Sequence, residues 1–240
     1  DTLNYMAEEL IRKEQLKNDF ISSISHELRT PLTSIKGWAI TLKSDNTRDE
    51  ELLGDGLDII EKESDRLSNM VEELLDFSRF VSGRITLEKE KINIAESIRQ
   101  VGKQFQFNAE SKDIEFNINC DFKLPPIYAD GNRIKQVLIN LLDNAFKFTP
   151  EGGKVTLNAR DNGQDLLIEV IDNGCGIDED DLPYIKEKFY KGKSSKASSG
   201  LGLSICDEII KLHNGTMQIE SRLNEGTKVT VTIPIEGVEN

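Results

Sequence analysis

Residues 133–148 read Arg-Ile-Lys-Gln-Val-Leu-Ile-Asn-Leu-Leu-Asp-Asn-Ala-Phe-Lys-Phe. Apolar side chains recur there in steps of three and four, which predicts a helix with one apolar side. Asn140, Asn144 and Lys147 form a single polar strip on this helix. Asparagine is a poor helix former, so two of them mid-helix suggest a task for the side chains, such as oxygen coordination of Mg²⁺ beside a lysine that meets phosphate. The alternative is an ordinary solvated helix face.

The segments around this helix alternate between strand and helix patterns. Period-two alternation predicts strands at residues 154–160, 166–171, 217–221 and 228–233, with a weaker candidate at 113–120. Helical spacing predicts further helices at residues 94–108, 182–189 and 203–213. This mixture favours an α+β or α/β sandwich with mixed strand order.

The first 82 residues show helical spacing alone. The pattern predicts one long helix that starts at Leu3, a polar break at residues 44–47, and a second long helix. Helices of this length measure about 50 to 60 Å, and a hairpin cannot cover apolar stripes on both of them. Pairing of two chains into a four-helix bundle would cover the stripes. The alternative is a monomer in which both stripes pack on the domain that follows.

His26 lies in the first helix and is one of only two histidines. It stands two residues from both Ile24 and Leu28, which places it on the side opposite the apolar seam and therefore in water. Thr30 shares that outer face one turn further on. Pro31 predicts a kink beside the histidine, because its ring crowds the preceding turn and it has no N–H to donate. The alternative is a bent helix with an ordinary surface histidine.

Two glycine-containing loops are further candidates for ligand binding. In residues 172–177, Asp-Asn-Gly-Cys-Gly-Ile, the glycines let backbone approach a flat ligand, and Asp172 can accept a hydrogen bond from an exocyclic amine. Residues 198–203, Ser-Ser-Gly-Leu-Gly-Leu, lead into a helix whose first N–H groups suit a phosphate. A plain turn is the alternative for the first loop. The acidic cluster at 178–181 favours a helix start over a metal site.

Charge and cysteine content exclude several classes of function. The chain has 30 basic and 43 acidic residues and a net charge of −13, which opposes binding to nucleic acid or to an anionic membrane surface. A local group of lysines can still attract phosphates, and the alternative is a flexible solvated loop: Lys186, Lys188, Lys191, Lys193 and Lys196. Three cysteines without a CxxC pair disfavour both a disulfide framework and a zinc site. No apolar run is long enough to cross a bilayer.

Five motifs, in this order, resemble the cytoplasmic core of a bacterial sensor histidine kinase. Residues 25–31, Ser-His-Glu-Leu-Arg-Thr-Pro, resemble the H box, and residues 140–150 resemble the N box. Residues 172–176, 189–191 and 200–202 resemble the G1, F and G2 boxes. The resemblance implies a helical hairpin that forms a dimeric four-helix bundle, followed by a Bergerat-type (GHKL) α/β sandwich that binds ATP.

The same resemblance implies a role for each matching residue. His26 is the expected phosphoacceptor, Glu27 accepts the proton of the other ring nitrogen and orients the ring, and Thr30 positions water for dephosphorylation of the partner. Asn144 is expected to coordinate Mg²⁺, and Asp172 to recognise adenine. The residues expected to bind the nucleotide are Asn140, Asn144, Lys147, Phe148, Asp172, Gly174, Gly176, Ile177, Tyr190, Lys191, Ser199, Gly200, Leu201, Gly202 and Leu203.

The chain departs from the family pattern at three places. Ser198 stands where a glycine is frequent, Lys191 where arginine is common, and Phe148 where tyrosine is common. A lysine at 191 offers a point charge instead of a two-pronged fork to the γ-phosphate. His213, beside Asn-Gly at an expected helix end, favours a structural role.

The interpretation is an ATP-dependent protein-histidine kinase with residues 1–82 as hairpin, 83–88 as hinge and 89–240 as catalytic domain. Its expected partners are a second copy of the chain and the receiver domain of a response regulator, with no nucleic acid and no direct membrane contact in this fragment. By resemblance the fragment is the cytoplasmic portion of a membrane-anchored protein. Alternatives are an ATP-hydrolysing machine of the gyrase or chaperone type, which carries Glu where Asn140 stands here, and a dimeric scaffold without catalysis.

Overall fold

The computed structural model describes residues 2–44, 50–81, 86–120, 123–188, 190, 192 and 200–235. The chain forms two compact units, Asp1–Arg84 and Ile85–Asn240. Residues 83–85 of the predicted hinge at 83–88 lie outside the described part of the chain. Within the described residues, no helix is both long enough and apolar enough to cross a membrane.

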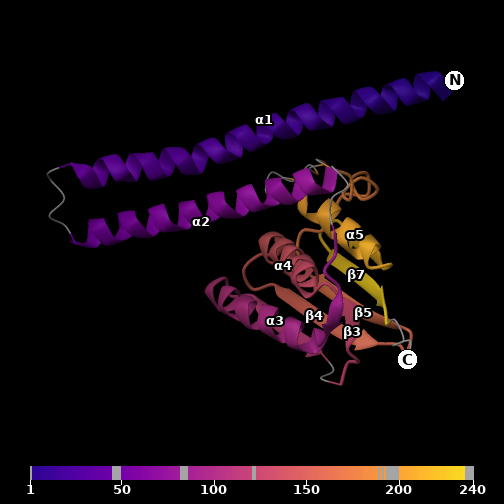
Figure 1. Ribbon diagram of the computed structural model, residues 1–240. Helices are drawn as coiled ribbons and strands as arrows, with labels where there is room; N and C mark the ends of the chain where they lie inside the picture. Colours follow the sequence, from indigo (N-terminus) through magenta and orange to yellow (C-terminus); the bar gives the residue numbers. More distant parts are fainter. Residues whose placement is uncertain are drawn as a thin grey trace. The chain divides into compact units, whose positions relative to one another are not determined.

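The first unit is a hairpin of two long helices, which confirms the prediction. Helix α1 spans Thr2–Lys43 and helix α2 spans Glu50–Val81, and the two run side by side (Figure 1). Helix α1 continues without a break through Pro31. The helices approach closely at Gly56, because a Cβ there would lie 2.8 Å from Cε3 of Trp38.

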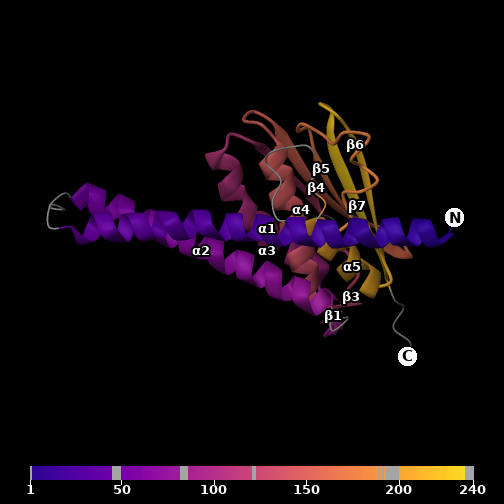
Figure 2. The same cartoon turned by 90° about the horizontal axis from the view of Figure 1, so that it is seen from above.

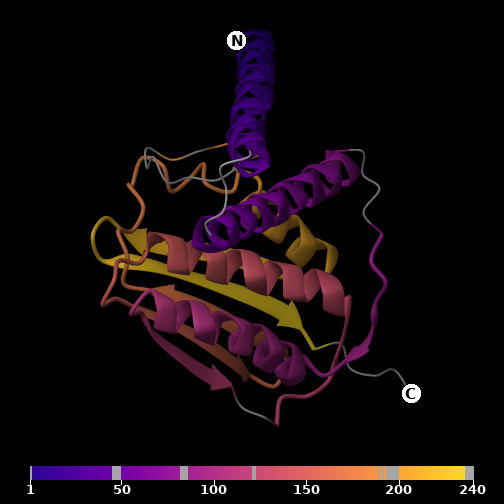
Figure 3. The ribbon, with the colours of Figure 1, turned by 90° about the vertical axis from the view of Figure 1, so that its left-hand side faces the viewer.

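The second unit is a five-stranded sheet with three helices on one face. The sheet order is β2 (Glu115–Cys120), β4 (Lys154–Asp161), β5 (Asp165–Asp172), β7 (Gly226–Pro234) and β6 (Thr216–Arg222). The pair β2–β4 is parallel and the other pairs are antiparallel, as expected for mixed order. Helices α3 (Ile94–Ser111), α4 (Gly131–Phe148) and α5 (Gly202–Leu212) lie as one layer over the sheet (Figure 3). Figure 2 shows the same layers from above.

Alternating burial along the central strands builds the core between sheet and helices. Strands β4 and β5 turn every second side chain toward the helices, among them Leu157 and Ile168. Helix α4 presents its buried stripe to them, and the ring of Phe146 packs on Phe105 and Phe116 at centroid distances of 5.4 and 5.2 Å. The apolar side of residues 133–148 is therefore the side that holds the two layers together.

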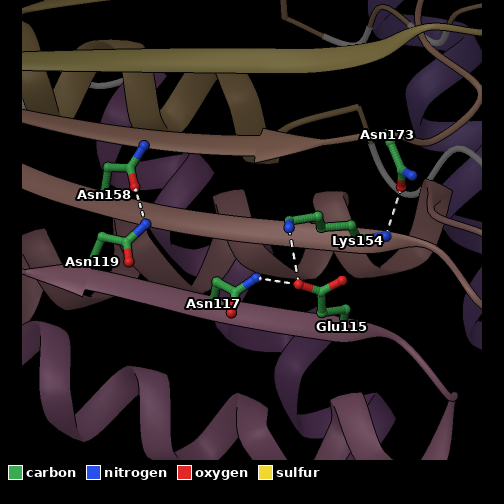
Figure 4. A network of polar contacts seen from close by, with 6 residues as sticks. All are labelled: Glu115, Asn117, Asn119, Lys154, Asn158 and Asn173. Atoms are coloured by element: carbon green, nitrogen blue, oxygen red, sulfur yellow. Dashed lines mark hydrogen bonds and ion pairs between the residues drawn. The ribbon is translucent and has the colours of Figure 1, made fainter.

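The opposite face of the sheet is polar. Nζ of Lys154 and Nδ2 of Asn117 both donate to Glu115, at 2.9 and 2.7 Å, and the pKa of Glu115 is lowered chiefly by the bond from Lys154 (Figure 4). Nδ2 of Asn119 donates to Asn158 on the neighbouring strand at 3.0 Å. These side chains alternate with the buried ones, so one face of the sheet meets the helices and the other meets water.

Three local features differ from the sequence predictions or were not predicted. The prediction of a helix at 182–189 is wrong: the described residues form successive turns with bonds such as Glu187 N–H to Tyr184 O at 2.7 Å. Contacts with distant elements hold this segment, because Nζ of Lys186 donates to Asp207 and to the carbonyl oxygen of Met217. Short strands β1 (Glu90–Ile92) and β3 (Ile127–Ala129) were not predicted and form a separate two-stranded sheet.

Candidate functional site

Strand β5 ends at Asp172, on the floor of a cavity of about 380 Å³. The Asp172 carboxylate accepts hydrogen bonds from the backbone N–H groups of Gly174, at 2.9 Å, and Thr227. Burial is the largest influence on this group and raises the pKa of Asp172, while the two N–H bonds partly oppose the shift. These bonds hold the carboxylate in one orientation, in which it lines the cavity and can accept a further hydrogen bond from a ligand.

The loop after Asp172 depends on two glycines that permit close backbone contact. A Cβ at Gly174 would overlap the carbonyl oxygen of Phe148, and the N–H of Cys175 donates to that same oxygen at 3.2 Å. Gly176 has φ +65°, and a Cβ there would overlap the carbonyl of Arg222. The loop therefore fits tightly between the end of α4 and the β6–β7 turn.

Helix α4 contributes Asn144 and Phe148 to the cavity wall. Asn140 and Lys147 share its polar strip but do not line the cavity. The side chain of Asn140 is hydrogen-bonded to the thiol of Cys206 on α5, a buried group whose pKa burial raises to about 12. Nζ of Lys147 lies 5.9 Å from the centre of the Phe148 ring.

Helix α5 begins at the cavity. Gly200 has φ +74°, and the buried Leu201 precedes the first helical residue, Gly202. Among the described residues, the N-cap residue Leu201 makes no side-chain capping hydrogen bond to the first backbone N–H groups of the helix. Such an end favours an anionic group such as phosphate.

The cavity gathers most of the predicted nucleotide residues from four separate segments. Those that line it are Asn144, Phe148, Asp172, Gly176, Ile177, Tyr190, Gly200, Gly202 and Leu203. Gly174 and Leu201 lie behind this lining, and the predicted residues Lys191 and Ser199 fall outside the described part of the chain. Further wall residues are mainly apolar, which suits a flat base: Leu141, Val170, Ile185, Ile219, Leu223 and Val229.

Sequence reasoning missed Asp181 and Thr227. Asp181 is 5% exposed and accepts a hydrogen bond from the Tyr190 hydroxyl at 2.8 Å, where a helix-start role was expected. Nothing in the spacing of the acidic cluster distinguishes this carboxylate from its neighbours. Thr227 reaches Asp172 through its backbone N–H, a contact that the sheet register creates and no side-chain pattern reveals.

The expected group of phosphate-attracting lysines needs one correction. Nζ of Lys186 donates to Asp207 at 3.0 Å and to the carbonyl oxygen of Met217 at 3.1 Å. This lysine therefore fastens the 182–188 segment to α5 and β6, because the buried carboxylate of Asp207 requires a cation. Lys191, Lys193 and Lys196 lie outside the described residues.

The first unit exposes His26, as predicted. Thr30 lies one turn along and its hydroxyl donates to the His26 carbonyl oxygen at 3.3 Å, while Glu27 is half-buried. A surface hollow of about 680 Å³ opens beside the imidazole, and its lining is His26, Arg29, Thr30, Thr33, Ser34, Gly37, Trp38, Thr41 and Leu52. The histidine is therefore accessible to a reactant from solvent.

The described residues contain no cluster of three or more His, Cys, Asp or Glu side chains able to hold a metal by themselves. The Asn144 amide oxygen is a hard donor of the kind Mg²⁺ accepts. Magnesium bound with nucleotide takes most of its ligands from phosphates and water, so a single amide donor in the cavity wall fits such an ion.

Comparisons with known proteins agree with both units. Residues 16–83 match the family described as "His Kinase A (phospho-acceptor) domain", and residues 129–237 match "Histidine kinase-, DNA gyrase B-, and HSP90-like ATPase". The sensor histidine kinase YclK of Bacillus subtilis (strain 168) is 33% identical over 238 residues, 97% of this chain and 50% of YclK. The chain thus spans about half the length of that relative.

Solved structures also resemble the chain, and two of them illustrate the likeness. The catalytic domain of the histidine kinase ThkA is 34% identical with a TM-score of 0.56, over 62% of this chain and 96% of that domain. The histidine kinase ThkA in complex with the response regulator protein TrrA is 32% identical with a TM-score of 0.69, over 95% of this chain and 65% of that one. On these grounds the chain belongs to the sensor histidine kinase family.

Proposed function

We propose that this chain is the core of an ATP-dependent protein-histidine kinase that phosphorylates its own His26. The observation that carries the proposal is the exposed imidazole of His26 beside an open hollow, in a chain whose second unit holds a cavity fit for a nucleotide. Neither feature alone indicates a kinase, because exposed histidines and apolar cavities are common. Their combination supplies the acceptor and the donor site of one phosphoryl transfer.

In the proposed step, one ring nitrogen of His26 attacks the γ-phosphorus of ATP. A nitrogen–phosphorus bond forms, the bond from the γ-phosphorus to the β–γ bridging oxygen breaks, and ADP leaves with its electron pair. Glu27, the next residue, takes the proton from the other ring nitrogen and orients the ring. Bound Mg²⁺ would neutralise charge on the phosphates, with Asn144 as its protein ligand.

In the nucleotide cavity, Asp172 accepts a hydrogen bond from the adenine amino group, and the apolar wall encloses the ring. The uncapped start of α5 receives the phosphate chain through its backbone N–H groups. Asn140 and Lys147 are assigned to the same phosphates by family resemblance. Their present contacts with Cys206 and Phe148 require both side chains to turn when nucleotide binds.

The functional unit is proposed to be a homodimer. Large apolar side chains of the hairpin are exposed on a single chain, among them Leu10 at 66%, Ile40 at 62% and Leu57 at 53%. A second copy placed against these stripes would bury them in a four-helix bundle. The match to the phospho-acceptor family supports the same arrangement.

The next acceptor is proposed to be an aspartate of a response-regulator receiver domain, with Thr30 positioning water for the reverse dephosphorylation. The solved complex of ThkA with TrrA supports a partner of this class. The protein is further proposed to work in the cytoplasm, attached to a membrane through parts outside this chain. The three free cysteines of the described residues are consistent with a reducing compartment.

Incubation with γ-³²P-labelled ATP and Mg²⁺ tests the proposal. The chain should become labelled, the label should be lost in acid and kept in alkali, and His26→Gln should abolish labelling. Because His26 is exposed, the free energy of unfolding of this variant should differ from that of the original chain by no more than about 0.5 kcal/mol. Ser22→Ala, at an exposed position one turn before His26 on the same helix, is the matched control, and it should keep autophosphorylation.

Each other outcome contradicts the proposal in a recognisable way. Label that persists in the His26→Gln variant would place the phosphoryl group elsewhere. Steady release of phosphate without any labelled protein would indicate an ATPase of the gyrase or chaperone type. Binding of ATP with neither label nor phosphate release would indicate a scaffold.

A further inference from the structure

A buried hydrogen bond joins two helices of the nucleotide-binding unit at the ends remote from the cavity. Asp130 is 7% exposed and His213 is 3% exposed. The backbone N–H of Asp130 donates to Nε2 of His213 at 3.0 Å. A backbone N–H can only donate, so Nε2 carries no proton; Nδ1 therefore carries it and donates to the carbonyl oxygen of Ile209 at 2.7 Å. The geometry thus requires a neutral imidazole in one tautomer.

The carboxylate of Asp130 adds three more bonds at the same place. Oδ1 accepts the N–H groups of Asn132 and Arg133, each at 3.1 Å, and so caps the start of α4. Oδ2 accepts the N–H of Glu88 at 3.0 Å. Glu88 belongs to the segment that leads into strand β1, and β1 pairs with β3, the strand just before Asp130. One buried residue therefore connects the entering chain to α4, and through His213 to α5.

Both helices lead from this junction to the cavity. Helix α4 runs about 20 Å from Asp130 to Asn144, and α5 runs from His213 back to Gly202. The two helices pack against each other along the way, with Sγ of Cys206 4.0 Å from the carbonyl oxygen of Val137. A shift of one helix relative to the other at the junction therefore changes the distance between their cavity ends.

We propose that the hydrogen bond from Asp130 to His213 is a positioning contact for nucleotide binding, which holds α4 and α5 in the relative placement that forms the cavity. Neither residue touches the cavity. The carboxylate of Asp130 also accepts the N–H of Glu88, so the segment that leads into β1 is held in a fixed position relative to α4 and α5. The inference rests on the proposed binding of ATP by this unit.

The contact has a built-in sensitivity to acid. Burial is the main cause that lowers the pKa of His213, nearby Lys89 lowers it further, and the Ile209 carbonyl and Asp130 oppose the shift. A lowered pKa means that the neutral ring stabilises the fold fully above the ordinary value of 6.5 and loses this contribution as pH falls toward the folded-state pKa. Protonated Nε2 would direct an N–H at the N–H of Asp130, and the bond would be lost.

Two substitutions in the complete chain test the positioning role. His213→Gln keeps a neutral acceptor for the Asp130 N–H, whereas His213→Phe fills the space without one. At pH 7.5, and at a temperature where all three proteins are folded, we expect the Kd for ATP to stay within about twofold of the original in His213→Gln and to rise at least about fivefold in His213→Phe. At saturating ATP the initial rate of His26 labelling in His213→Phe should return to that of the original chain, because a positioning contact for binding changes KM more than kcat.

The pH dependence of the Kd for ATP separates the two roles, because a merely structural histidine would not affect it. As the pH falls from 7.5 through the folded-state pKa of His213, the Kd of the original chain should rise relative to that of His213→Gln, and this ratio cancels the titration of ATP itself. With only two histidines in the chain, nitrogen-15 spectra of the His26→Gln variant show His213 alone. They should show the Nδ1–H tautomer at neutral pH, whether or not ATP binds.

Several results would overturn the inference without touching the proposed kinase function. These are equal ATP binding by His213→Phe and the original chain, an identical pH profile in the original and His213→Gln, or an Nε2–H tautomer. If His213→Phe does not fold, the tautomer and the profile of His213→Gln decide the matter. Failure of the original chain to bind ATP would instead refute the proposed function.

Discussion

Replacement of Gly226 by alanine should weaken both the fold and the binding of nucleotide. Gly226 has φ +105°, a conformation that L side chains rarely adopt, and it opens strand β7 next to Asp172. An added Cβ would overlap the carbonyl oxygen of Asp172 and would lie 2.8 Å from Cα of Asn173. These neighbours are backbone atoms, so the loop that carries Asp172 has to move.

The structure offers a matched control at Gly163. This glycine also has a positive φ, +90°, but a Cβ there would meet nothing within 4 Å. Both alanine variants therefore bear the strain of an unfavourable backbone conformation, about 1 to 3 kcal/mol. Only Gly226→Ala adds the displacement of Asp172. A hydrogen bond to a charged group is worth about 1.5 to 3 kcal/mol, so its loss from Asp172 should raise the Kd for ATP about 10- to 100-fold.

Calorimetric titration with ATP and thermal unfolding, carried out on both variants, separate the two effects. Gly163→Ala should lose stability and bind ATP as the original chain does. Gly226→Ala should lose stability and affinity together. The reasoning is refuted if Gly226→Ala keeps its affinity for ATP, or if Gly163→Ala loses as much affinity as Gly226→Ala does.

Three further predictions concern single side chains. Asp172→Asn should lower the affinity for ATP yet raise the free energy of unfolding at pH 7, because the raised pKa of Asp172 means that the folded state disfavours its charged carboxylate. This gain in stability, measured by urea unfolding, should shrink as the pH falls through the folded-state pKa and vanish below about 3.8. Tyr190→Phe should raise the KM for ATP in the labelling assay several-fold, because it removes a donor from the buried Asp181 carboxylate, and an unchanged KM would show that this bond does not shape the cavity. Leu142→Ala, at a fully buried position of α4, should reduce the free energy of unfolding by about 2 to 5 kcal/mol, whereas Phe107→Ala, at an exposed position, should change it by less than about 0.5 kcal/mol; similar losses in the two would contradict the assigned core.

Periodicity predicted the helices and strands that have one buried face. Residues 133–148 illustrate this, because the apolar stripe seen in the sequence is the buried stripe of α4, which packs on β5 and the neighbouring helices. The exposed position of His26 followed from the same reasoning, since its angle to Ile24 and Leu28 is a property of the helix alone. The apolar stripes of the hairpin likewise follow from its sequence, and the structure shows them exposed.

Prediction failed where a local pattern competes with distant contacts. Residues 182–188 have helical spacing, yet they form turns, with Lys186 bonded to Asp207 and Met217 in elements far along the chain. The bond between Tyr190 and Asp181 likewise depends on how those turns fold. Spacing reports only on neighbours within a helix or strand, so it carries no information about such contacts.

The sequence by itself determined most of the segments that form helices and strands and which side of each is apolar, because those properties depend on the repeat of the backbone. It also determined the types of chemical group available, among them His26 and Asp172. Only the tertiary structure decided that the N–H of Thr227 meets Asp172 and that Asp130 meets His213, 83 residues further along. Such pairs depend on strand register and helix packing, which arise from the whole core at once.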